Sequence, residues 1–113
     1  MDGPVQAVVT QSRAPLVQSA TAAADGTATV TFRSRGPHVC EAKQIGVRMP
    51  SAGGAIGQMY FNGSPVSPFV PAQDAIAGEP SQLFGPGDEI VLAVTGATPG
   101  SVLTASLFYN QLD

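Results

Sequence analysis

The stretch EIVLAVTGATPGSVLTASLFY, residues 89–109, decides the fold of this chain. Ile90, Leu92 and Val94 alternate with other residues, which predicts a β-strand with one face turned to a core. The segment GATPG, residues 96–100, then predicts a turn. Apolar residues again take every second position in the return segment, where one face carries Leu103, Ala105, Leu107 and Tyr109. The stretch therefore predicts two strands separated by a turn.

Strand-like segments and turn signals continue towards the N-terminus. We predict strands over residues 27–33, 39–49, 55–61 and 81–84, the first with Ala28, Val30 and Phe32 on its inner face. Asn62-Gly63 is the strongest hairpin signal, because both residues tolerate a positive φ. Prolines in the return segment 64–70 restrict it to an edge strand or a loop. Residues 73–80 are predicted to form a loop.

The composition and the turn spacing together indicate the fold class. Ten prolines and 13 glycines interrupt the chain too often for long helices. About seven or eight short strands with frequent turns are typical of a β-sandwich or jelly roll. A chain of 113 residues fits one domain. We therefore expect an all-β protein, with one β-sandwich or jelly-roll-like domain at residues 25–113 and an extended N-terminal arm at residues 1–24.

Two parts of the chain are candidates for contact with a partner. The arm is proline-containing and apolar, and a segment that cannot bury itself often lies on a neighbour. An ordinary frayed terminus is the alternative. Phe69 lies in a proline-rich segment, where it either anchors a partner or caps one end of the sandwich. The candidate interface residues are Val5, Val8, Val9, Leu16, Val17 and Phe69.

The charge pattern argues against nucleic acid and favours protein partners. Charged residues make up 12% of the chain, about half of the usual share of roughly 25%. A surface with so little charge indicates either contact with other proteins or simply a neutral β-protein surface. The net charge is −3, and none of the five basic residues follows Arg48. Nucleic-acid binding needs clustered basic residues, so we expect no nucleic-acid partner.

Few residues are suited to catalysis or metal binding. His38 is the single histidine and Cys40 the single cysteine, too few for a zinc site or an intrachain disulfide. Cys40 lies in a predicted strand, where a lone cysteine usually serves as a small core residue. We assign no catalytic, metal or cofactor-binding residue and expect a protein that is not an enzyme. An enzyme of unfamiliar type remains a minor alternative.

The sequence also gives no signal for a membrane. No apolar run approaches the roughly 18 residues of a membrane span. The first residues lack the basic start and apolar core of a signal peptide. We therefore expect synthesis in the cytoplasm and no membrane partner.

Four segments resemble a known class of proteins: ATVTF at residues 28–32, EAKQIGV at 41–47, GPGDEIVLAVTGATPG at 85–100 and VLTASLFY at 102–109. Over residues 25–110 the chain resembles small β-sandwich structural proteins of tailed bacteriophages that infect actinobacteria. The resemblance implies a virion protein made in the host cytoplasm, most simply a capsid decoration or cement protein, and it supplies no catalytic residues. The implied partners are the major capsid protein or other virion proteins, together with further copies of the chain, for example in a trimer. A tail or surface module that recognises host carbohydrate or protein through residues 63–80 is the alternative.

Overall fold

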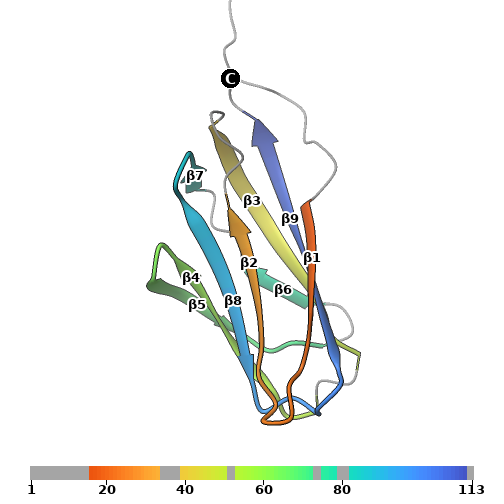
Figure 1. The fold of residues 1–113 in the computed structure, drawn as a ribbon. Coiled ribbons are helices and arrows are strands. Elements are labelled where there is room, and N and C mark those ends of the chain that lie inside the picture. Colours follow the sequence, from red (N-terminus) through yellow and green to blue (C-terminus); the bar gives the residue numbers. More distant parts are fainter. Residues whose placement is uncertain (1–15, 34–38, 51–52, 73–74, 79–81, 112–113) are drawn as a thin grey trace, which may run out of the picture.

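The computed structural model describes residues 16–33, 39–50, 53–72, 75–78 and 82–111. These residues form strands and turns without any helix, which confirms the all-β prediction (Figure 1). The strands are β1 (Leu16–Thr21), β2 (Ala28–Arg33), β3 (Cys40–Arg48), β4 (Ile56–Phe61), β5 (Ser64–Phe69), β6 (Ala75–Gly78), β7 (Gln82–Phe84), β8 (Glu89–Thr95) and β9 (Val102–Gln111).

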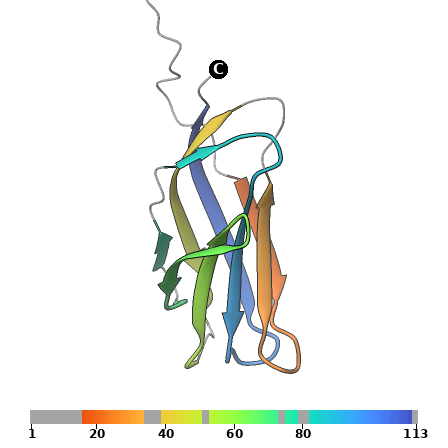
Figure 2. The ribbon, with the colours of Figure 1, turned by 90° about the vertical axis from the view of Figure 1, so that its left-hand side faces the viewer.

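Two antiparallel sheets make up the domain. Sheet I has the order β1-β9-β3-β6, with β7 also paired to β3, and sheet II has the order β2-β8-β4-β5. Sheet II lies in front of sheet I in Figure 2. The pairs are nested, since β4 pairs with β5, β3 with β6 and β7, β2 with β8, and β1 with β9. A long hairpin rolled up in this way is a jelly roll, so the predicted sandwich is confirmed.

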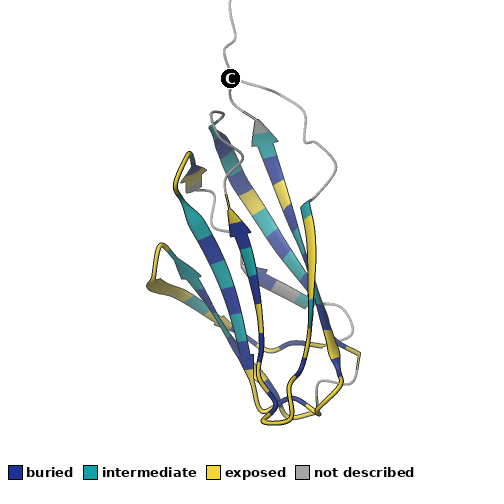
Figure 3. Cartoon of the chain, viewed as in Figure 1, coloured by how far each residue is buried: buried dark blue, intermediate teal, exposed yellow. Residues whose placement is uncertain are grey.

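The core consists of the inward side chains of both sheets. Burial alternates along most strands, as the period of two requires (Figure 3). The predicted inner faces of residues 28–32, 90–94 and 103–109 are all buried, and Cys40 is buried as expected. The largest fully buried side chains include Phe32, Phe84, Ile45, Met49, Met59, Leu92, Leu103 and Leu107.

One extra residue keeps β3 facing the core along its whole length. Ala42 pairs with Tyr109 and Gln44 with Phe108, so Lys43 is the additional residue of a β-bulge. Cys40 and Ala42 are buried before the bulge, and odd-numbered residues are buried after it. Without the bulge, one half of this central strand would turn its apolar side chains outward.

Two predicted boundaries need correction. Residues 16–21 were expected in the arm, but they form β1 and pair with β9 from Leu16↔Leu107 to Thr21↔Val102. The sandwich therefore includes this segment, and the boundary between residues 24 and 25 is wrong. Residues 73–80 were expected as a loop, but β6 within them pairs with β3. Val5, Val8, Val9 and His38 lie outside the described residues.

Of the two alternatives predicted for Phe69, the structure contradicts the one in which it anchors a partner. Phe69 is only 6% exposed and lies opposite Gly57 in the β4–β5 pair. A Cβ atom built on Gly57 would lie 2.3 Å from Cζ of the Phe69 ring. The ring therefore occupies the space that the glycine leaves free, and it is part of the core.

We predict that Gly57→Ala lowers the free energy of unfolding by about 1–3 kcal/mol, because the new methyl group overlaps the Phe69 ring. Urea titration measures this loss. Gly54→Ala is the control, since no heavy atom lies within 4 Å of a Cβ at that position. Equal stability of the two variants would show that Phe69 does not pack on Gly57.

Candidate interaction surfaces

An uncharged hollow lies over β4, β5 and β8 in sheet II. It has a volume of about 440 Å³, within the usual range of ligand pockets. Ala55, Gly57 and Met59 are buried, so the alternation of β4 directs the residues between them outward. The residues that line this sheet II hollow are Ile56, Gly57, Gln58, Tyr60, Pro68, Phe69, Val70, Ala93 and Thr95.

Two aliphatic side chains dominate the exposed apolar area beside this hollow. Ile56 is 63% exposed and Val70 is 69% exposed. Large aliphatic side chains in an uncharged hollow favour contact with another molecule, since burying them removes apolar surface from water. The sheet II hollow is therefore the first candidate surface.

A second, broader hollow of about 770 Å³ lies over sheet I. Its walls come from β3, β6 and β9 and are mostly small or hydroxyl-bearing: Gly46, Val47, Arg48, Ala75, Thr104, Ser106 and Phe108. On its β1 side, the hydroxyl groups of Ser19 and Thr104 are hydrogen-bonded at 3.2 Å. Arg48 is the one charged residue in this lining. This hollow is shallow and carries little charge, so it suits a broad contact with a protein better than a small ligand.

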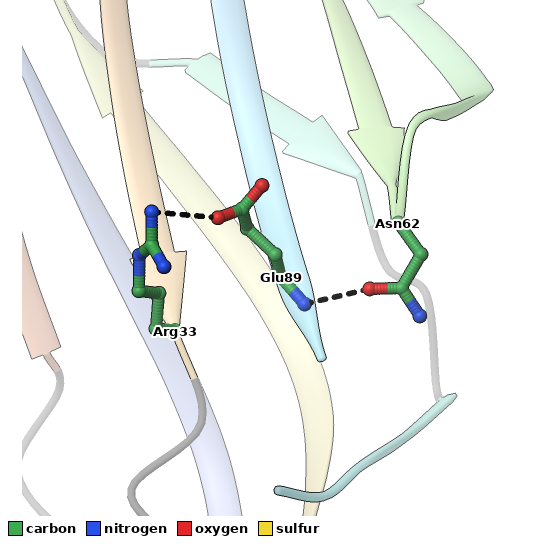
Figure 4. Close-up of polar contacts among 3 residues, drawn as sticks. All are labelled: Arg33, Asn62 and Glu89. Atoms are coloured by element: carbon green, nitrogen blue, oxygen red, sulfur yellow. Dashed lines mark hydrogen bonds and ion pairs between the residues drawn. The ribbon is translucent and has the colours of Figure 1, made fainter. Parts of the chain in front are cut away.

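Charged residues gather instead at the end of the sandwich where β2 ends and β8 begins (Figure 4). Arg33 Nη2 lies 3.0 Å from Glu89 Oε2. The Asn62 side-chain carbonyl accepts a hydrogen bond from the Glu89 N–H at 2.8 Å, and its amide donates to Asp88 Oδ1 at 3.0 Å. These contacts join the β4–β5 turn to the start of β8, so the polar cluster holds two turns together.

The Asp88 carboxylate is stabilised by two donors. The Gly85 N–H donates to Oδ2 at 2.8 Å, and the Asn62 amide donates to Oδ1. The pKa of Asp88 therefore lies below its ordinary value of 3.8, with the Gly85 bond as the larger cause and the Asn62 bond as the second. The two hydrogen bonds therefore stabilise the ionised form of the Asp88 carboxylate at this turn.

Two observations bear on metal binding and on the reactivity of Cys40. No group of three or more metal-ligating side chains occurs among them. Cys40 is buried in the core, where its thiol is shielded from reactants in solution.

The structure separates the candidate interface residues from one another. Leu16 is half-buried and packs against the core, whereas Val17 is 54% exposed on β1. Phe69 lies inside the sandwich, on the other side of the domain from β1. The three of these six residues that the structure describes therefore do not share one surface.

Sequence reasoning missed Ile56 and Val70. In the structure Ala55, Gly57 and Met59 face the core, which puts Ile56 on the opposite face of β4. In β4 a glycine faces the core and an isoleucine is exposed, which is the reverse of the usual tendency of isoleucine to be buried. The residue types of this strand therefore did not indicate which of its faces is buried. The explanation lies in Phe69, which fills the core beside Gly57 from the neighbouring strand.

Comparisons with known proteins identify no family, because no protein-family model and no curated protein sequence matches this chain. Within the described ranges, no helix has the length and apolar character needed to cross a membrane. The case for a function therefore depends on the surfaces described above.

We predict that Asp88 titrates with a midpoint below 3.8 in side-chain NMR, and that Asn62→Gly raises this midpoint. Glycine is chosen because Asn62 has a φ of 51°. Because the pKa of Asp88 is lower in the folded state than its ordinary value of 3.8, the ionised carboxylate stabilises the fold at pH values above 3.8. This stabilisation is lost as the pH falls through the lowered pKa.

Asp25 is the internal control for this titration. Its pKa is also lowered, first by the Thr27 hydroxyl and then by the Thr27 N–H. Asn62→Gly should leave the Asp25 midpoint unchanged. An Asp88 midpoint at or above 3.8, or one that does not respond to the substitution, would contradict the assigned hydrogen bonds.

Proposed function

We propose that this chain is a structural virion protein of a tailed phage, and specifically a capsid decoration or cement protein that binds the major capsid protein and stabilises the head. The observation that carries the proposal is the uncharged, partly aliphatic hollow of sheet II, together with the sparsely charged hollow of sheet I and a β-sandwich fold. The resemblance of residues 25–110 to phage structural proteins supports the same conclusion. On this proposal the protein is made in the host cytoplasm and resides in the virion.

The size of the exposed apolar patch fits a contact that is weak for one copy. Ile56 is 63% exposed and Val70 69% exposed, so burying the rest of each side chain contributes about 1–2 kcal/mol. Association costs at least about 4 kcal/mol in lost freedom of motion. The free energy gained by burying these two side chains does not exceed the cost of association. Stable attachment therefore needs further contacts, or several copies of the chain attached to the same shell. A shell that presents many identical sites can supply both.

A tail or surface module that recognises host carbohydrate or protein is the second candidate. The observation in its favour is the sheet II hollow, whose volume of about 440 Å³ suits a small ligand and whose lining includes Tyr60 and Gln58. A glycan array separates the two candidates. A decoration protein should bind no glycan, whereas a host-recognition module should bind a defined subset.

We predict that the double variant Ile56→Ser, Val70→Ser binds phage heads lacking this protein at least about tenfold more weakly than the wild type, because it loses apolar contact. Co-sedimentation with heads measures the affinity. Val102→Ser is the matched control, since Val102 is exposed on sheet I. Full binding by the double variant would exclude the sheet II hollow as the contact.

A second prediction tests the N-terminal arm. A chain that begins at Leu16 keeps all nine described strands, so it should retain the unfolding temperature of the whole protein. We expect its affinity for heads to fall at least about tenfold, because Val5, Val8 and Val9 are lost. Undiminished attachment would remove the arm from the proposed contact.

A further inference from the structure

The outer edge of β1 is open in the part of the chain that the structure describes. β1 pairs with β9 on one side and stands last in the strand order of sheet I. In an antiparallel pair, every second residue of an edge strand turns its N–H and C=O away from its partner. Three of the six residues of β1 therefore present hydrogen-bonding groups at this edge. Such an edge is a template for another strand.

The other sheet edges carry features that discourage strand addition. β5 contains Pro65 and Pro68, which cannot donate a backbone hydrogen bond. β6 and β7 have only four and three residues. β2 ends in the charged, exposed Arg33. β1 has the sequence LVQSAT, with no proline, no charge and no bulge in its pairing.

The side chains of β1 are only partly covered in the single chain. Leu16 and Ala20 pack against the core but remain half-buried. Gln18 belongs to the same face and is exposed, and Val17 is exposed on the opposite face. An additional strand at this edge would cover side chains on both faces of sheet I as well as the backbone groups.

The neutral strands at this edge and the self-complementary hydrogen bonding of an antiparallel β1 pair fit a second copy of this chain as the occupant. With a net charge of −3, two copies repel one another unless neutral surfaces meet. β1 and β9 contain no charged residue. When β1 pairs with itself in antiparallel fashion about a two-fold axis, donors and acceptors match in number on the two sides.

We propose that two copies of the chain associate through antiparallel pairing of their β1 edges, which joins the two five-stranded copies of sheet I into one continuous sheet. One six-residue strand from each copy buries less than the roughly 1,200 Å² of a stable interface. The dimer is therefore concentration-dependent. It forms without any virion component, so it stands or falls independently of the proposed function.

Gln18→Lys tests the proposal. Gln18 is exposed, so the single chain accommodates lysine, but an added strand would enclose the ammonium group on the core-facing side of the sheet. Gln44→Lys adds the same charge to β3, an interior strand of sheet I. Sedimentation equilibrium up to about 1 mM protein, a range suited to weak association, gives the dissociation constants. Circular dichroism confirms that both variants are folded.

We expect the wild type and Gln44→Lys to form dimers with similar dissociation constants, and Gln18→Lys to weaken the dimer at least about tenfold. Amide hydrogen exchange of the wild type should slow in β1 as the protein concentration rises. A wild type that stays monomeric would overturn the proposal. An unchanged dissociation constant in Gln18→Lys would also overturn it. Loss of the dimer only in Gln44→Lys would overturn it as well, because the contact would then lie on the face of sheet I.

Discussion

Apolar contact between the inward faces of the two sheets is the constraint on which the rest of the structure depends. Every strand pair in the nested hairpin must present its apolar side to this shared layer. The bulge at Lys43 corrects the phase of β3, and Gly57 makes room for the Phe69 ring of the next strand. Both local irregularities therefore serve the packing of the layer. Since the layer takes one face of each sheet, the opposite faces are left for contact with other molecules.

The sequence predicted those strands whose own residues alternate between apolar and polar or end at a clear turn. Alternation located β2, β8 and β9, and Asn62-Gly63 located the β4–β5 hairpin, because these features are contained within a few residues. β1 and β6 were missed, because each is defined by pairing with a distant strand and not by its own periodicity. The candidate site was harder to predict. The exposure of Ile56 and the burial of Phe69 follow from one cross-strand contact that no local pattern contains.

The distribution of charge links the fold to the proposed role. Among the described residues, Arg33, Asp88 and Glu89 hold strand ends and turns together at one end of the sandwich, and the other charged side chains are Asp25 in a turn and Glu41, Lys43 and Arg48 on β3. The sheet II hollow is left without charge, and Arg48 is the one charged residue in the lining of the sheet I hollow. A shell protein that must fit many identical neighbours benefits from such surfaces, since weak apolar contacts add across copies without requiring one strong site.

The most direct test of the central claim, that the sheet surfaces are the working part of the molecule, is a hydrogen-exchange footprint of the chain free and bound to phage heads. The account predicts slower exchange in β4, in β5 and in the residues that follow Phe69, with little change around the buried Cys40. Unchanged exchange in the presence of heads, or protection centred on Cys40, would contradict it.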